Sequence, residues 1–190
     1  MATQTSRTHS VKFTYEDYLL FPEDGRRHEL IGGDRYVTPS PNMKHQAILA
    51  NLHRILGPFV HERRLGKLLF APFDILFSDL DVVQPDMLFV SAPRASIITD
   101  KNVRGAPDLV IEVLSDSTRK TDEIIKRKLY ERFGVQEYWL LDPDLETIKV
   151  YQNTEKGHIR AAELSREAGD ALTSPLLPGL SISLDAVFAA

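Results

Sequence analysis

The chain has 190 residues, a formal net charge of −4, 43% hydrophobic and 26% charged residues, and no cysteine. This length and composition are typical of one globular domain with a real core. The lack of cysteine excludes disulfides, thiolate zinc sites and cysteine nucleophiles. A net negative charge is not typical of nucleic-acid-binding domains, which are often strongly basic, although local patches of charge matter more than the net charge.

No apolar run reaches the roughly 18 residues that a membrane helix needs. The N-terminal "MATQTSRTHS" has no apolar signal segment, so we expect a cytoplasmic protein with no membrane partner. Residues 1–11 are polar and predict a flexible tail, and residues 12–190 then form a single domain.

The N-terminal part predicts two short elements and one long helix. Thr14 is a candidate N-cap for one or two helical turns that end at Pro22. Two short strands around Gly32 and Gly33 have the composition of a hairpin. Residues 42–64 predict a helix, because apolar residues recur there at spacings of three and four: Ile48, Leu49, Leu52, Ile55, Leu56, Phe59 and Val60.

The middle of the chain predicts strands. Residues 67–79, 82–91 and 108–115 are rich in apolar and β-branched side chains. Residues 95–107 predict a connection with a short helical piece. Residues 116–134 predict a helix that ends at a glycine.

The C-terminal part predicts a strand at 135–143, a hairpin at 147–164, and an apolar tail at 172–188 that packs on the body. The order of helix, three strands, helix and strand, with extra hairpins at both ends, predicts an α/β or α+β domain with a mixed sheet.

Three acidic residues, Asp86, Asp108 and Glu112, lie in or beside apolar strands. Buried carboxylates are usually paired or metal-bound, so a salt bridge, a cap or a strand edge would explain each one alone. Asp108 and Glu112 are about 13 Å apart along a strand and cannot share an ion. Antiparallel pairing of the two strands brings Asp86 near Glu112 and leaves Asp108 near Ser91, whereas parallel pairing reverses this choice. Such oxygen ligands suit Mg²⁺ or Mn²⁺.

The helix after Glu112 has a lysine on its apolar side. At 100° per residue, Lys126 falls within the arc formed by Ile125, Leu129, Tyr130 and Phe133. Its side chain either extends along the surface to water or points at the carboxylates. Asp122 shares the arc, but its position in the first turn also suits the helix dipole.

Two carboxylates, a divalent ion and an ammonium group are the components of a phosphodiester-cleaving site. The ion lowers the pKa of a bound water and neutralises phosphate charge. The lysine orients the water or stabilises charge that develops on the phosphate.

Six segments together resemble one known family, in the order of that family. They are "HELIGGDRYV", "KHQAILANL", "VVQPDMLFV", "APDLVIEVLSDST", "KRKLYERFGVQEYWLLDP" and "PLLPGLSISLDAVF". The family is Uma2, and the resemblance runs from about Tyr15 to Phe188. It implies a restriction-endonuclease-like nuclease of the PD-(D/E)XK type, with a central mixed sheet flanked by helices.

By position, Pro85 and Asp86 match the PD element of that motif, and Glu112 matches its second acidic residue. Leu114 stands where the motif has lysine. The resemblance implies that Lys126, one helix later, takes the place of this lysine. Asp86, Glu112 and Lys126 are therefore the expected catalytic residues, and Asp86 and Glu112 are the expected metal ligands.

Glu29, His45 and Asp108 also match family positions and are expected as accessory residues. Glu29 is either an extra metal ligand or a salt-bridge partner of Arg26 or Arg27. His45 either touches phosphate or only caps its helix. A shared position does not by itself make Asp108 a ligand.

These residues predict a DNA endonuclease that depends on Mg²⁺ or Mn²⁺. The net charge and the displaced lysine leave a second reading, a catalytically inactive module that binds nucleic acid or protein. A third reading is a structural protein whose acids all form salt bridges. The sequence leaves the kind of nucleic acid and its strandedness open, and a homodimer is compatible with the expected fold.

Overall fold

The structure is a computed structural model that describes residues 11–189, so residues 1–10 of the predicted tail lie outside the described residues. Its largest element is a six-stranded sheet in the order β11-β10-β9-β8-β6-β3. β8 is antiparallel to β6 and parallel to β9, which confirms the predicted mixed sheet. The strands are β3 (Gly66–Phe70), β6 (Met87–Ser91), β8 (Leu109–Val113), β9 (Glu137–Asp142), β10 (Thr147–Thr154) and β11 (Gly157–Ser165).

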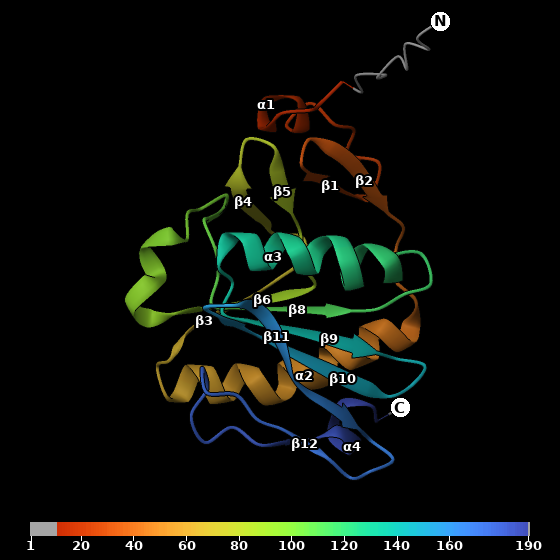
Figure 1. Cartoon of the computed structure of the whole chain (residues 1–190), viewed down its shortest axis with the longest axis vertical. Helices are drawn as coiled ribbons and strands as arrows, with labels where there is room; N and C mark the ends of the chain where they lie inside the picture. The colour runs from red at the N-terminus through yellow and green to blue at the C-terminus, as the bar shows by residue number, and fades with distance from the viewer. Residues whose placement is uncertain (1–10, 190) are drawn as a thin grey trace, which may run out of the picture.

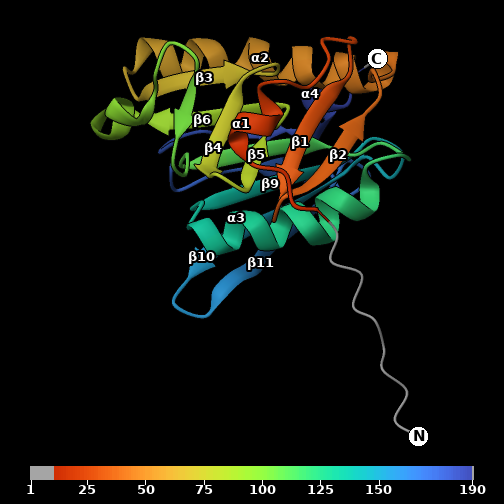
Figure 2. The same cartoon turned by 90° about the horizontal axis from the view of Figure 1, so that it is seen from above.

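Two helices cover opposite faces of this sheet (Figures 1 and 2). α2 (Met43–Glu62) is the predicted long helix, and Asn42 caps it through the N–H of His45. Successive strand residues point to opposite faces. Ile111 therefore packs in the cluster on the α2 side, and Val110 packs in the cluster on the side of α3 (Arg127–Phe133).

A second, five-stranded sheet has the order β2-β1-β5-β4-β7. The predicted hairpin at Gly32 and Gly33 is present, and it joins this sheet through the pairing of Leu30 with Val82. The strands are β1 (Arg27–Ile31), β2 (Asp34–Thr38), β4 (Asp74–Ser78), β5 (Asp81–Val83) and β7 (Asn102–Arg104). The second sheet contributes to the apolar cluster on the α3 side.

Two segments that the sequence predicted as strands each divide at a proline. Residues 67–79 form β3 and β4 on either side of Pro72, and residues 82–91 form β5 and β6 on either side of Pro85. Proline has no N–H to donate to a sheet ladder, so a strand tends to end there. In both cases the chain passes from one sheet to the other, and Asp86 lies at the second crossing.

The predicted helix at 116–134 begins with one wide turn. Thr121–Lys126 is π-helical and leads directly into α3, which ends at Gly134 with φ 79°. A π turn closes its hydrogen bonds from i to i+5, so it holds more residues than an α-helical turn, and such turns are frequent at functional sites. Here the wide turn carries Asp122 and Lys126, both buried.

The remaining elements are short. α1 (Tyr15–Tyr18) starts at the predicted cap, Thr14. The connection at 95–107 holds the end of a 3-10 helix (Ala92–Ile97) and also β7, which was not predicted.

The C-terminal tail packs on the body, as predicted. It forms β12 (Ala171–Leu172), β13 (Ile182–Ser183) and α4 (Leu184–Val187), and its apolar side chains join the cluster on the α2 side. Within residues 11–189, no helix combines the length and apolarity needed to cross a membrane.

Candidate active site

The register of β6 and β8 brings two predicted site residues together. The strands are antiparallel with Met87 opposite Ile111, so Asp86 and Glu112 are neighbours at the end of the pair. The N–H of Asp86 donates to Glu112 Oε2 over 3.4 Å, and the N–H of Val113 donates to Asp86 Oδ2 over 2.9 Å. Both carboxylates are buried. The antiparallel arrangement, on which the choice of Asp86 depended, is confirmed.

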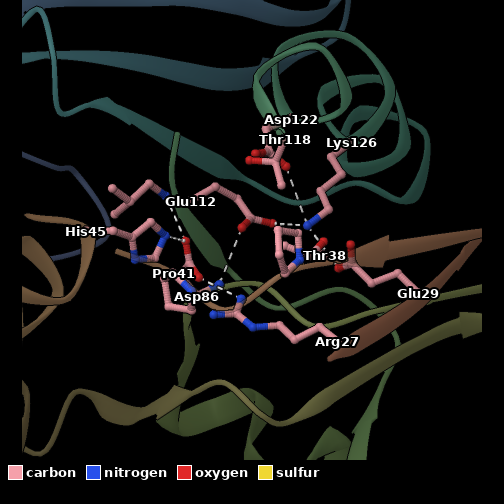
Figure 3. A pocket seen from close by; sticks show the side chains of 12 residues that line it. Arg27, Glu29, Thr38, Pro41, His45, Asp86, Glu112, Thr118, Asp122 and Lys126 are labelled. Carbon is pink, nitrogen blue, oxygen red and sulfur yellow. Dashed lines mark hydrogen bonds and ion pairs between the residues drawn. The ribbon is translucent and has the colours of Figure 1, made fainter. Parts of the chain in front are cut away.

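Lys126 points into this pair rather than to water (Figure 3). Its Nζ lies 2.9 Å from Glu112 Oε1, 2.9 Å from Glu29 Oε1 and 3.5 Å from Asp122 Oδ1. The lysine side chain is only 5% exposed, so the alternative in which it extends to solvent is wrong. A single ammonium is thus shared by three carboxylates from β1, β8 and the π turn.

Asp86 is held by two other side chains. Arg27 Nη1 lies 2.7 Å from Asp86 Oδ1, and His45 Nε2 lies 3.0 Å from Asp86 Oδ2. His45 therefore contacts a site carboxylate rather than only capping its helix. Glu29 pairs with Lys126 and accepts from the N–H of Gln84, so the expected salt bridge with Arg26 or Arg27 is not formed.

Acidic groups outnumber basic ones in this cluster. Four carboxylates, Glu29, Asp86, Glu112 and Asp122, face the cations of Lys126 and Arg27. With all six ionised, the excess is two negative charges, and a charged His45 reduces it to one. Buried charge without balance is costly, so it is met either by bound protons or by a bound cation.

The pKa values express this imbalance. Burial raises the pKa of Glu112 to about 8, against the opposing charge of Lys126. Burial likewise raises the pKa of Asp122 to about 6. Burial acts in the same direction on Asp86, but the hydrogen bond and charge of His45 and the charge of Arg27 outweigh it and lower the pKa to about 2. Burial acts to lower the pKa of Lys126, but the surrounding carboxylates hold it well above the usual value.

The cavity between these side chains is small. Its volume is about 20 Å³, enough for about one water molecule. Besides the charged cluster, its walls include Thr38, Pro41 and Thr118 (Figure 3). The space suits a single small ion or water, not a substrate.

The carboxylate oxygens of the cluster are the ligands that a hard divalent ion prefers, although they are not arranged as a preformed metal site. Within residues 11–189, no three His, Asp or Glu side chains are placed to hold a metal ion together. The carboxylates are instead engaged by Arg27, His45 and Lys126. The oxygen donors, the excess negative charge, and Asp122 Oδ1, which accepts no hydrogen bond within the described chain, all fit Mg²⁺ or Mn²⁺.

Asp108 lies outside this cluster. Its Oδ2 accepts from the N–H of Ser91 over 2.7 Å, and its Oδ1 accepts from Arg94 and Gln136 over 2.8 and 2.9 Å. It sits at the other end of β8, where antiparallel pairing was expected to leave it.

Three site residues were missed from the sequence. Asp122 shares the buried arc with Lys126, and that shared arc was the available signal, but its position in the first turn favoured a dipole role. Tyr130 belongs to the predicted apolar arc, yet its hydroxyl donates to Glu112 Oε1 over 2.8 Å. Nothing in the sequence indicated that Arg27 reaches Asp86, because the contact joins the two sheets.

A family model matches most of the chain. The model of the Uma2 family, described as "Putative restriction endonuclease", matches residues 15–185. No protein with a curated description matches the chain.

Two solved structures are similar to it. A crystal structure described as "a putative nuclease belonging to DUF820 from Anabaena variabilis ATCC 29413" has a TM-score of 0.78 and 24% identity, and the match covers 93% of this chain and 98% of that one. This likeness shows the restriction-endonuclease-like fold. The type IIG restriction endonuclease BpuSI gives a TM-score of 0.39 and 13% identity over 64% of this chain and 13% of its own, too low to carry an argument.

Proposed function

The chain belongs to the Uma2 family, and from that premise we propose that it is a metal-dependent nuclease that hydrolyses phosphodiester bonds in DNA. One observation carries the proposal. Asp86 and Glu112, adjacent on antiparallel strands, lie with Lys126 in a buried cluster that has more negative than positive charge.

In this proposal Asp86 and Glu112 hold Mg²⁺ or Mn²⁺. When bound, the ion lowers the pKa of a water molecule and neutralises charge on the phosphate. Lys126, anchored by Glu29 and Asp122, orients the attacking water or stabilises the charge that develops on the phosphate. His45 and Arg27 position Asp86. We further propose a cytoplasmic location, and a homodimer where both strands of a duplex are cut.

The direct test is cleavage of plasmid DNA with Mg²⁺ or Mn²⁺ by wild type, Asp86→Asn and Glu112→Gln. Asp144→Asn is the matched control, because Asp144 is an exposed acid. We expect cleavage by wild type and the control only. Equal cleavage by wild type and Glu112→Gln would mean that the activity comes from a contaminant or another site.

A second candidate is a binding module without catalysis. The observation in its favour is that protein cations already pair with the carboxylates in the absence of a preformed metal site among residues 11–189. Titration calorimetry with Mn²⁺ separates the two. Binding that Asp86→Asn abolishes supports the nuclease, and absence of binding to wild type supports the module.

A further inference from the structure

Three larger hollows lie around the small catalytic cavity: two share lining residues with it, and the third shares lining residues with one of these two. A hollow of about 260 Å³ shares Arg27 and Asp86 with the cavity. A hollow of about 800 Å³ beside α1 shares Arg27 with both. A hollow of about 540 Å³ between α2 and β3 shares His53 and Phe70 with the first. We call the three neighbouring hollows together the α1–β3 groove.

The catalytic cavity opens partway along this groove, at Arg27 and Asp86. One arm runs toward α1, where Tyr18, Phe21 and Arg26 line it. The other arm is lined by residues of α2 and of the edge strand β3, two elements that lie side by side in Figure 2. The cavity itself holds about 20 Å³, so a polymeric substrate can only lie in the groove and present one phosphate to the cavity. A groove that extends to both sides of the site suits cleavage within a chain.

The β3 arm contains an exposed aromatic platform. Phe70 is 38% exposed at the end of β3. The ring of His53 meets it edge-on, with ring centres 4.8 Å apart and the planes at 86°. An exposed aromatic face in a groove stacks unpaired bases of any sequence. Bases inside a duplex are already stacked on one another and do not offer a free face.

The chain segment beside the far end of the same arm is basic, and its Glu62 and Lys67 line the hollow. The segment 61–67, "HERRLGK", has a formal charge of +2 with histidine neutral, in a chain of −4. Among residues 11–189, no carboxylate lies within ion-pair distance of Arg63, Arg64 or Lys67. The helix dipole explains why two arginines stand here, because they follow the last turn of α2 and cations are stabilised near a helix C-terminus. The dipole does not explain the position of Lys67, because this lysine lies on β3, where it lines the groove.

We propose that the α1–β3 groove holds one unpaired strand of nucleic acid. The backbone crosses Arg27 beside the catalytic cavity, a base stacks on Phe70, and Lys67 contacts a phosphate. This assignment names a substrate class and rests on the proposed nuclease function.

The test is fluorescence anisotropy of a labelled single-stranded oligodeoxynucleotide, and of the duplex of the same sequence, with EDTA present so that cleavage plays no part. Wild type is expected to bind the single strand more tightly than the duplex. Phe70→Ala should weaken single-strand binding by about 5- to 150-fold, the range for loss of one stacked base. Lys67→Ala should weaken it less and reduce the salt dependence by roughly 0.7 in the log–log slope.

Two matched variants control for general loss of surface. Ile159→Ala removes an exposed apolar side chain from β11, and Lys156→Ala removes a lysine from the β10–β11 turn. Both should bind as wild type does. Thermal melting of every variant, with an unchanged midpoint, shows that the effect is local.

The proposal is overturned if wild type binds no single strand, if it prefers the duplex, or if Phe70→Ala and Lys67→Ala bind like wild type. These outcomes are separate from failure of the nuclease. Intact binding without metal-dependent cleavage removes the nuclease and keeps the groove, whereas cleavage that needs Glu112 but not Phe70 keeps the nuclease and removes the groove.

Discussion

Asp108 and Glu112 stand four residues apart in the same buried stretch of chain, and their surroundings differ in one respect. Asp108 has an arginine, an amide and a backbone N–H to itself. Glu112 shares one ammonium with Glu29 and Asp122. A balanced buried acid stabilises the fold through its partners, whereas an unbalanced one favours an added cation or a bound proton. Burial alone therefore does not distinguish a structural acid from a site acid, but local charge balance does.

The largest effect is expected when the site acid, Glu112, is neutralised. Glu112→Gln should reduce metal-dependent cleavage by at least about 100-fold, because it removes a charge from the reacting centre. Its melting temperature should stay the same or rise, since like charge is relieved. Cleavage rate and thermal melting measured on the same sample check both parts. A Glu112→Gln variant whose melting temperature falls together with its cleavage rate would indicate that Glu112 is a structural acid like Asp108.

Removing the shared ammonium group of Lys126 tests the same excess of negative charge by increasing it. Lys126→Met should destabilise the metal-free protein by about 3–5 kcal/mol, because it leaves buried carboxylates without a partner. Denaturant unfolding measures this loss, and Mn²⁺ should restore more stability to the variant than to wild type. Lys128→Met is the control, because Lys128 is an exposed lysine two residues away. Equal stability of the two variants would contradict the described role of Lys126.

The balanced acid should behave in the opposite way. Asp108→Asn should cost about 1–3 kcal/mol of unfolding free energy, because hydrogen bonds to a charged, buried acceptor weaken. Cleavage per folded molecule should remain. Unfolding and cleavage are measured together, and loss of activity in the fully folded variant would bring Asp108 into the site.

The last expected effect is a dependence on pH, which is spread over several pH units. The pKa of Glu112 is raised from 4.5 to about 8 in the folded protein. Its contribution to stability is therefore full below the unfolded value and is lost as pH rises toward 8, by at most about 1.4 kcal/mol per pH unit for one proton. Metal-free wild type should lose unfolding free energy between pH 5 and 8, and Glu112→Gln should lose less. Parallel pH profiles for the two proteins would show that Glu112 carries no such proton.

Local sequence patterns were enough to predict several features of the fold and of the site. The period of the helix placed Lys126 on the apolar arc without any knowledge of its partners, and the cap at Thr14 and the turn at Gly32 follow from residue type alone. Strand geometry also separated Asp108 from Glu112, because the distance between residues along a strand is fixed. The resemblance to the family named Asp86 and Glu112 as a pair, and the β6–β8 register places them side by side.

Other features depended on contacts between distant segments. The division of two predicted strands at Pro72 and Pro85 had a local signal in the prolines, but the assignment of each half to a different sheet did not. The pairing of Arg27 with Asp86 joins residues 59 positions apart. Asp122 was visible on the right arc, but its burial depended on the π turn, which an ideal helical period does not contain.

The sequence by itself determined most of the helices and strands, which lysine falls on the apolar arc of its helix, and which acids stand in apolar surroundings, because these depend on residue type and spacing along the chain. Only the tertiary structure decided the charge balance around each acid. That balance is a sum over side chains from β1, β8, α2 and the π turn, and no local pattern records how many of them meet at one point.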